Sequence, residues 1–423
     1  MNPQEDPQQI QDLAQQLARQ FVTMRQQRTN RATPSSQVTD ASANAGIGDI
    51  TNLASQLGSL LNARETSKET STHEERASST TIATNTTPAT IGTSLPAAVV
   101  AAAAVDPFDS VPDPSIYEAD FVNVFKGTNT SVLQFENREL LDLASDQMPI
   151  GRFFEEAEAM ADEFPDDSLD DVVIRRLLHW FKNEYFTWVN QPPCARCESS
   201  TTSTGGVAPS VQERQDGAGV VETYKCTSPD CSQITRFPRY GGMPRILFET
   251  RRGRCGEWAN CFTVCCRALG YKARFVHDTT DHVWTEVWSE HKQRWIHCDS
   301  CEAAYDQPLL YTTGWGKALS YCVSFSAEEV VDVTRRYTVD FDAVVAKRRR
   351  SIREPVFAKF LHRLSESNFS RLDLKPEEVL TIRQRQAKER DDLVGKGGDN
   401  RAIETKDRQS GSDEWTKARG ERK

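Results

Sequence analysis

The stretch of residues 251–270 constrains this chain most, because a cysteine stands immediately before an apolar helical pattern. The pattern predicts a buried helix, since its residues recur at spacings of three and four: Trp258, Phe262, Cys265, Cys266 and Leu269. Gly270 suits the end of that helix. Cys255 would then lie at the helix N-terminus beside Arg254, and both features favour a thiolate over a thiol. We interpret Cys255 as a nucleophile and the cysteines inside the helix as packing residues.

The residues after this helix supply partners for a nucleophile, which needs a base and a group that orients the base. Three short runs rich in β-formers predict strands: residues 271–277, 282–288 and 294–299. His282 opens the second run and Asp299 closes the third, so an antiparallel hairpin brings both to one end of the sheet. The sequence therefore predicts a triad of Cys255, His282 and Asp299.

Two cysteine pairs precede this region, on either side of a polar insertion. Cys194 and Cys197 are separated by two residues, and Cys226 and Cys231 by four. Four thiolates give zinc a closed tetrahedral shell, and both gaps are within known ligand spacing. We expect one structural zinc per chain, held in a zinc ribbon over residues 190–235. The alternative is four unligated thiols on a mobile loop.

Composition indicates one substantial folded domain with polar flanks. Hydrophobic residues make up 38% of the 423 residues, which is low for a chain that is folded throughout. The net charge of −10 does not suggest a nucleic-acid partner. The apolar run of residues 97–105 is too short to cross a bilayer, and the polar start has no signal-peptide pattern. We therefore expect a cytoplasmic protein whose 11 cysteines stay reduced, ligate metal or react.

Composition also divides the chain into three regions. Residues 1–114 are rich in Ser, Thr and Ala, and we expect them to be mostly disordered apart from two amphipathic helix candidates, residues 8–27 and 50–61. Residues 115–345 are the expected catalytic core, with the zinc ribbon inserted in it. Residues 346–423 are the expected helical extension, followed by a disordered, charged tail.

Three local patterns give further expectations. Residues 117–134 mix β-formers with a Gly-Thr-Asn turn and suggest a hairpin or an extended arm. Residues 306–325 suggest further strands and turns. The basic run of residues 347–350 lies in a helical pattern, so we interpret it as a solvated helix face. A nuclear signal is the alternative, and it would add a nuclear location to the cytoplasmic one.

Four runs of the chain resemble the cytoplasmic peptide:N-glycanases, which belong to the transglutaminase-like superfamily: residues 235–240 (TRFPRY), 251–260 (RRGRCGEWAN), 281–286 (DHVWTE) and 295–302 (WIHCDSCE). The similarity covers about residues 114–340 of the sequence. The wider gap between Cys226 and Cys231 departs from the two-residue gap typical of that family. The resemblance implies an α+β fold, with a transglutaminase-like, papain-like cysteine hydrolase core that contains the zinc ribbon.

The resemblance also implies a reaction, which is hydrolysis of the amide between an asparagine side chain and the first N-acetylglucosamine of an N-linked glycan. The glycan is released and the asparagine becomes aspartate. Misfolded N-glycoproteins would be the substrates, in the cytosolic quality control that accompanies ER-associated degradation. A ubiquitin- or proteasome-linked shuttle protein would be the partner. Glycan preference and oligomeric state stay open.

Four residues are candidates for contacts with the glycan, because aromatic rings stack on sugars and carboxylates accept hydroxyl protons: Trp284, Glu286, Trp295 and Glu302. On an alternating strand, Trp284 and Glu286 share one face. An apolar core would not place a glutamate on its own face, so we expect this face to line a groove. Core packing is the alternative for each tryptophan.

Two other classes of function fit the same residues. A transglutaminase-like protease or acyltransferase would use Cys255 in the same way, but the zinc ribbon and the glycanase-like runs argue against it. A catalytically silent glycoprotein-binding module would keep the fold, and the intact triad disfavours that alternative.

Overall fold

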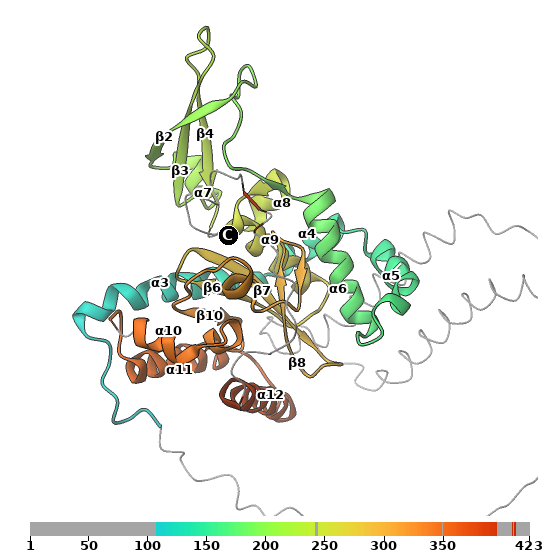
Figure 1. Ribbon diagram of the computed structural model, residues 1–423, viewed down its shortest axis with the longest axis vertical. Coiled ribbons are helices and arrows are strands. Elements are labelled where there is room, and N and C mark those ends of the chain that lie inside the picture. The colour runs from blue at the N-terminus through green and yellow to red at the C-terminus, as the bar shows by residue number, and fades with distance from the viewer. Residues whose placement is uncertain (1–106, 242–243, 349, 396–407, 409, 412–423) are drawn as a thin grey trace, which may run out of the picture. The chain divides into compact units, whose positions relative to one another are not determined.

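The computed structural model describes residues 107–241, 244–348, 350–395, 408 and 410–411. These residues belong to one compact unit, and Figure 1 shows how its helices and strands are arranged. The two amphipathic helix candidates of the N-terminal region lie outside the described residues.

The core contains a six-stranded antiparallel sheet in the order β11-β10-β6-β7-β8-β9. Its strands are β6 (Ala273–Asp278), β7 (His282–Ser289), β8 (Arg294–Asp299), β9 (Ala304–Tyr305), β10 (Cys322–Phe325) and β11 (Val330–Asp332). The three strands predicted after the Cys255 helix are confirmed, and they lie next to one another in the sheet. β7 begins at His282 and β8 ends at Asp299, so the hairpin brings both residues to one edge.

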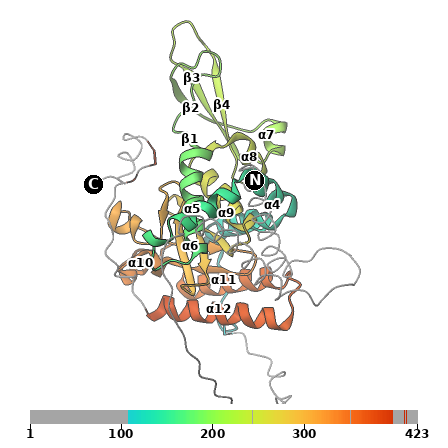
Figure 2. The same cartoon turned by 90° about the vertical axis from the view of Figure 1, so that its right-hand side faces the viewer.

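Helix α9 (Cys255–Ala268) is the predicted buried helix, and it packs on one face of the sheet. Thr263 Oγ1 on α9 lies 2.7 Å from Thr285 Oγ1 on β7, which joins helix and sheet by a buried hydrogen bond. Gly270 follows the helix with a φ of +79°, a left-handed conformation that glycine adopts without strain. Helix α4 (Arg138–Gln147) packs against α9, and helices α5 (Ile150–Ala159) and α6 (Leu169–Trp180) pack against each other (Figures 1 and 2).

Residues 117–134 do not form the expected hairpin or arm, because they lie in helix α3 (Ile116–Val132) and the turn after it. The β-formers of this run fall on one helical face, where Val122, Phe125 and Val132 are buried. A capping interaction fixes the start of the helix, since the Ser115 N–H donates to the Glu118 carboxylate at 2.8 Å. Packing of this face outweighs residue propensities that differ by only a few tenths of a kcal/mol.

Residues 306–325 also differ from the expected run of strands, since a π-helical turn, η5 (Leu310–Gly314), precedes β10. This turn places the Tyr311 ring 4.4 Å from the ring of Trp284 on β7. Trp284 and Thr285 point to opposite faces of the strand. Since α9 meets Thr285, η5 covers the sheet face opposite α9.

Helix α10 (Phe341–Arg348) begins within the range expected for the core, and helices α11 (Glu354–Phe369) and α12 (Pro376–Gly395) follow it in the chain. The basic run is only partly a solvated face, because Arg348 is buried and pairs with Asp332 and Glu354 at 2.7 Å. No helix within the described residues is both long and apolar enough to span a bilayer.

Helix α12 is joined to the sheet by a cluster of buried charges. Glu389 on α12 accepts hydrogen bonds from Arg274 on β6 and from Arg336 in the short helix η6 (Thr334–Tyr337). Arg274 and Arg336 also bond the carboxylate of Glu286 on β7, and Arg274 pairs with Glu329 as well. Each of these charges has a buried partner of opposite sign, which offsets the cost of removing it from water.

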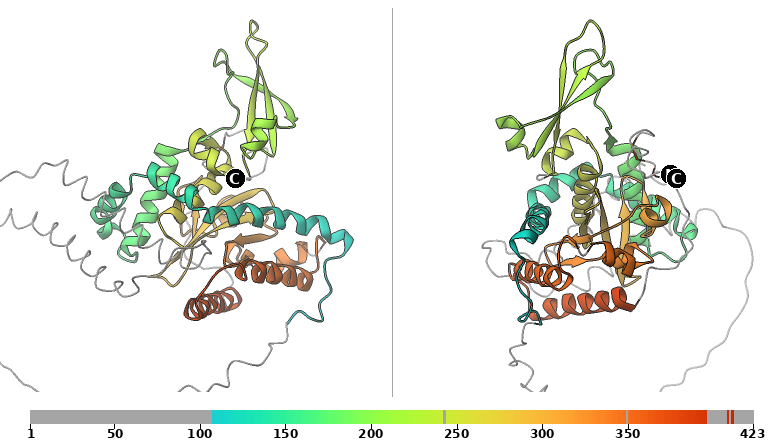
Figure 3. Two further views of the ribbon diagram at one scale, coloured as in Figure 1. Left: turned by 180° about the vertical axis from the view of Figure 1, so that it is seen from behind. Right: turned by 60° about the vertical axis from the view of Figure 1, so that its left-hand side comes forward.

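A separate three-stranded sheet, in the order β2-β3-β4, forms the expected zinc ribbon together with the four cysteines. Cys194 and Cys197 precede β2, Cys226 ends β3, and Cys231 lies between β3 and β4. Its strands are β2 (Thr201–Val207), β3 (Val220–Cys226) and β4 (Ile234–Arg239), with helix α7 (Val211–Gln215) between β2 and β3. Figure 3 shows this sheet beyond helix α8 (Leu247–Thr250). A short parallel pair, β1 (Thr187–Trp188) and β5 (Arg252–Gly253), joins the chain before the ribbon to the chain before α9.

The buried charge cluster predicts a measurable asymmetry along α12. We expect Glu389→Ala to lower the free energy of unfolding by about 3 kcal/mol, because it removes a buried carboxylate that Arg274 and Arg336 share and leaves an excess of buried positive charge. Glu377→Ala, which removes an exposed carboxylate at the start of the same helix, should change it by less than about 0.5 kcal/mol. Urea unfolding of both variants measures the difference. Equal effects would contradict the inference that Glu389 joins α12 to the sheet.

Candidate active site

The backbone before α9 is shaped so that Cys255 becomes the first residue of the helix. Gly253 lies against Glu257, and a Cβ on that glycine would come within 2.4 Å of the glutamate Cβ. The Glu257 carboxylate accepts the Arg254 N–H at 3.0 Å, which satisfies one donor at the helix N-terminus. Cys255 therefore sits in the first turn, where the helix dipole favours a negative charge.

Arg254 has a different role from the one its position next to Cys255 suggests. Its guanidinium bonds both oxygens of Glu222 on β3, at 2.9 and 2.7 Å, and also the carbonyls of Val189 and Asn190. Glu222 in turn accepts a bond from Arg239, which holds Glu257 at 2.8 and 2.9 Å. Arg254 thus anchors the ribbon to the start of α9, and the charges that act on the Cys255 thiol come from elsewhere.

His282 and Asp299 form the second part of the site. His282 Nε2 lies 2.8 Å from Asp299 Oδ2, and both side chains are almost completely buried. Because an ionised carboxylate only accepts hydrogen bonds, Nε2 must carry the proton of this bond. The ring nitrogen left for Cys255 is Nδ1, which is buried and has no other hydrogen-bond partner among the described residues.

The electrostatics of the site favour a thiolate on Cys255. Burial alone would raise the pKa of this thiol, but its interactions with His282 and Arg408 outweigh burial and hold the pKa below its usual value. Burial alone would lower the pKa of His282, but Asp299 outweighs burial and raises it. A cysteine with a lowered pKa beside a histidine with a raised one is the arrangement of a thiolate–imidazolium pair.

Asp299 stays ionised because every part of its carboxylate is hydrogen-bonded. Oδ1 accepts the N–H groups of Cys301 at 2.8 Å and Glu302 at 3.3 Å, and Oδ2 accepts the Tyr311 O–H at 2.9 Å in addition to His282. Burial opposes ionisation, yet His282 and these donors hold the pKa of Asp299 well below its usual value.

Three aromatic rings enclose the imidazole of His282. The ring centroids of Trp315, Tyr311 and Trp284 lie 5.1, 5.2 and 5.9 Å from it. Such a cage restricts ring rotation and keeps water away from the Asp299 side of the ring, which strengthens the charge interactions inside it. Trp284 thus supports the histidine ring.

The groove expected on the Trp284 and Glu286 face of β7 is therefore not open in this structure. Trp284 and Glu286 are fully buried, and Trp295 is 2% exposed, with the Arg274 guanidinium 4.0 Å from its ring centroid. The expectation was wrong for this face, because it assumed that a glutamate could not lie in the core. Arginines from β6 and η6 balance the charge of Glu286 and make its burial possible.

Glu302, the fourth candidate for a substrate contact, lies on the loop directly after Asp299. It is buried, and its Oε1 accepts the backbone N–H of Ser410 at 2.9 Å. Arg408 lies nearby, with its guanidinium 4.7 Å from the ring centroid of Trp315 and 5.9 Å from that of Trp188. Glu302 is thus the one of the four that lies outside strands β7 and β8, on the loop that follows Asp299.

The four cysteines predicted to bind metal lie together. Cys194 and Cys231 have their sulfurs 3.7 Å apart, those of Cys197 and Cys226 are 3.5 Å apart, and all four sulfurs are within 4.8 Å of one another. A tetrahedral zinc with Zn–S bonds of about 2.3 Å would separate its sulfurs by roughly 3.8 Å. Backbone N–H groups of Arg196 and Ser228 point at the sulfurs of Cys194 and Cys226. The donor set therefore fits a structural metal, although the structure does not identify which one.

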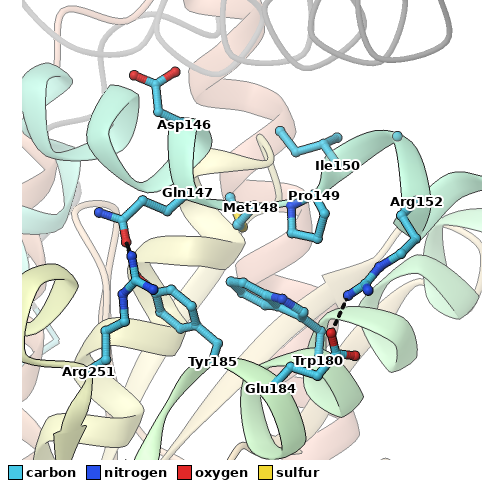
Figure 4. A pocket seen from close by; sticks show the side chains of 11 residues that line it. Asp146, Gln147, Met148, Pro149, Ile150, Arg152, Trp180, Glu184, Tyr185 and Arg251 are labelled. Carbon is cyan, nitrogen blue, oxygen red and sulfur yellow. Dashed lines mark hydrogen bonds and ion pairs between the residues drawn. The ribbon is translucent and has the colours of Figure 1, made fainter. Parts of the chain in front are cut away.

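A cavity of about 450 Å³ lies apart from these residues, between α4, α5 and the π-helical turn η3 (Phe181–Tyr185). In Figure 4 the two arginines of the cavity are directed at partners, Arg251 at Gln147 and Arg152 at Glu184, whereas Asp146 points away from them. None of Cys255, His282 and Asp299 lines it. Both arginines that line the cavity are thus already paired within the protein.

Two features of the site could not be foreseen from the sequence, Tyr311 and the Glu222–Arg254 link. Tyr311 lies in a segment that was expected to be strand, so its approach to Asp299 depends on the π-helical turn. Glu222 lies in the ribbon, for which the sequence predicts metal binding and no contact with the Cys255 helix. Neither residue belongs to a motif whose spacing could have identified it.

A thiol at a helix start beside a buried histidine–aspartate pair on an antiparallel sheet defines a cysteine hydrolase of the transglutaminase-like class. Family models agree: residues 204–300 match the transglutaminase-like superfamily, and residues 272–393 match the Rad4 transglutaminase-like domain. Among solved structures, a chain of the Rad4/XPC nucleotide excision repair complex aligns with a TM-score of 0.38 and 14% identity, over 66% of this chain and 59% of that one.

Curated relatives define the family. A peptide-N(4)-(N-acetyl-beta-glucosaminyl)asparagine amidase of Yarrowia lipolytica is 40% identical over 304 residues, which are 70% of this chain and 83% of that protein. The mouse protein of the same name is 40% identical over 311 residues, and the human one 45% over 248, but the chain covers only 47% and 38% of their lengths. The chain belongs to the peptide-N(4)-(N-acetyl-beta-glucosaminyl)asparagine amidase family.

The link between ribbon and α9 predicts that a ribbon mutation affects Cys255. We expect Glu222→Ala to slow alkylation of Cys255 by iodoacetamide about tenfold at neutral pH, because a shift of the start of α9 moves the thiol away from His282, which favours the reactive thiolate. Glu213→Ala is the matched control, since Glu213 pairs with Arg236 inside the ribbon. Metal content should stay unchanged in both, and equal alkylation rates would contradict the link.

Proposed function

We propose that this protein is a peptide-N(4)-(N-acetyl-beta-glucosaminyl)asparagine amidase, which hydrolyses the amide between an asparagine side chain and an N-linked glycan. The observation that carries the proposal is the thiol–imidazole–carboxylate arrangement of Cys255, His282 and Asp299 in a chain 40% identical to a relative of that name. Nucleophiles of this kind attack amide carbonyls and form covalent acyl intermediates.

In the first half of the proposed reaction, the Cys255 thiolate attacks the carbonyl carbon of the asparagine side chain. A C–S bond forms and the C–N bond breaks. His282 Nδ1, which holds the proton taken from the thiol, gives it to the departing nitrogen, so the glycan leaves as a glycosylamine. Asp299 balances the ring charge through Nε2–H during this transfer.

In the second half, water hydrolyses the thioester. His282 Nδ1 takes a proton from the water, whose oxygen adds to the acyl carbon, and the C–S bond breaks to regenerate the thiolate. The asparagine is thereby converted to aspartate. Backbone N–H groups in the first turn of α9 are the proposed donors to the oxyanion of both tetrahedral intermediates, since they have no partner within the helix.

Glu302 is the residue that we propose as a substrate contact. It follows Asp299 by three positions, and its carboxylate already receives a donor from a backbone N–H, as it would from a sugar hydroxyl. Trp284, Glu286 and Trp295 support the site instead through the cage around His282 and the buried charge cluster.

We propose zinc as the metal of the four-cysteine cluster, and a structural role for it. Four thiolates leave no open coordination position for a substrate or water. When bound, the metal would fix the two cysteine pairs and thereby the sheet that carries Glu222. It takes no part in the steps at Cys255.

Misfolded N-glycoproteins in the cytosol are the proposed substrates. All 11 cysteines are free thiols, which suits a reducing compartment. A shuttle protein that connects ubiquitin or the proteasome to this enzyme is the proposed partner. The amphipathic helix candidates in residues 8–27 and 50–61 are the proposed binding segments for this partner. The basic run of residues 347–350 is the proposed signal for an additional nuclear location.

A denatured high-mannose glycoprotein tests the proposed activity directly. We expect the protein to release the glycan, seen as a gel shift, and Cys255→Ala to abolish release because no other described thiol meets the histidine. Cys265→Ala is the control, since Cys265 is fully buried on the same helix and its loss should cost stability and spare turnover. Equal losses of activity in two folded variants would contradict Cys255 as the nucleophile.

Metal analysis tests the ribbon. We expect about one zinc per chain, and Cys197→Ser should lose most of it and lower the melting temperature, because binding energy at such sites is folding energy. Ser199→Ala, next to the first pair, should keep both. Loss of metal without loss of stability would contradict a structural role.

A further inference from the structure

Behind Asp299 lies a chain of buried hydrogen bonds that the proposed reaction does not use. His297 Nε2 lies 2.7 Å from the Tyr311 hydroxyl, and that hydroxyl lies 2.9 Å from Asp299 Oδ2. The same Oδ2 bonds His282 Nε2 at 2.8 Å. All four side chains are buried, so water does not compete for these bonds.

The proton positions in this series of hydrogen bonds follow from the charge of Asp299. Asp299 is ionised and can only accept, so both His282 Nε2 and the Tyr311 hydroxyl donate to Oδ2. The tyrosine has one proton, and it is committed to Asp299. His297 Nε2 must therefore carry a proton and donate it to the tyrosine oxygen. Burial lowers the pKa of His297 to about 4, so this ring is neutral near pH 7.

We propose that Tyr311, held by His297, is a positioning residue that sets how strongly Asp299 binds the His282 imidazolium. Two donors, His282 Nε2–H and the Tyr311 O–H, share the Asp299 Oδ2 oxygen. Each one reduces the negative charge on that oxygen that is available to the other. The Tyr311 O–H thus weakens the attraction of Oδ2 for the imidazolium. His282 consequently stays acidic enough to protonate the departing glycosylamine, which a fully stabilised imidazolium would do poorly. This role rests on the proposed function, but its electrostatic part does not depend on the substrate.

Charged and titratable groups face both members of the His282–Asp299 pair. His282 faces Asp299 on β8, Cys255 on α9 and Arg408 of the C-terminal segment. Asp299 faces His282, His297 and Tyr311, with Cys301 close by. Removal of the Tyr311 hydroxyl changes none of these charges. It leaves Oδ2 with a single donor, so the imidazolium is held more tightly and the pKa of His282 rises further.

Tyr311→Phe keeps the ring that cages His282 and removes only the hydroxyl. The test is the pH dependence of glycopeptide turnover and of Cys255 alkylation by iodoacetate, an anion that the His282 imidazolium attracts, with the alkylation corrected by use of Cys255→Ala. The alkaline limb, where His282 loses its proton, should move to higher pH by about half a unit to one unit. The kcat should fall about tenfold with KM within about twofold, because only proton transfer is affected. His297→Leu should shift the limb in the same direction by less, because the tyrosine becomes a weaker donor.

Tyr337→Phe is the matched control. Tyr337 is also buried, packs on Trp284, and donates its hydroxyl at 2.6 Å to a carboxylate, that of Glu286 rather than Asp299. The Tyr337→Phe variant should lose stability to a similar extent as Tyr311→Phe. It should leave the alkaline limb of both pH profiles, alkylation and turnover, in place.

Several outcomes would overturn the proposal. An alkaline limb that stays in place or moves to lower pH in Tyr311→Phe would do so. If that variant does not fold, a folded His297→Leu with an unmoved limb overturns the proposal equally. A shifted alkylation profile in a protein that releases no glycan would leave the proposal standing and contradict the proposed function instead.

Discussion

The Asp299 carboxylate accepts four hydrogen bonds inside the protein, and the arrangement of the site depends on them. Two come from the backbone after β8, one from Tyr311 and one from His282. The backbone donors fix the carboxylate in the loop, and the His282 bond fixes which ring nitrogen carries a proton. Nδ1 is thereby left to act on Cys255. Without the two backbone donors the carboxylate would not be fixed in the loop, and His282 would lose the partner that orients its ring.

The position of Cys255 depends on a second set of buried charges. Glu257 accepts the N–H before the helix, Arg239 holds Glu257, and Arg254 and Arg239 share Glu222 on the ribbon. Cys255, the proposed nucleophile, is therefore placed by contacts from the ribbon as well as from the sheet. The ribbon that contains the four-cysteine cluster thus contacts the start of the helix that carries Cys255.

Sequence periodicity predicted the parts of this fold that are continuous in the chain. Helix α9, its glycine stop and the β6 to β8 strands follow from local patterns, and His282 and Asp299 could be paired because each stands at a strand end. The spacing of four cysteines likewise predicted their cluster. Contacts between distant segments were not accessible in the same way. Glu286 is buried because Arg274 lies 12 residues before it and Arg336 lies 50 residues after it, and no local pattern connects the three.

The same limit explains why α3 and Tyr311 were misjudged. The β-formers of α3 are stabilised as a helix by burial against the rest of the core, and Tyr311 reaches Asp299 because a π-helical turn points it inward. Both are tertiary effects that override local propensity.

The most direct measurement of the central claim is a glycopeptide reaction run in water enriched in heavy oxygen and followed by mass spectrometry of the peptide. Hydrolysis of a Cys255 thioester predicts an aspartate at the former glycosylation site that carries one heavy oxygen, with an intact peptide backbone and a glycosylamine product. Cleavage of the backbone, or a peptide that keeps its asparagine, would contradict the account.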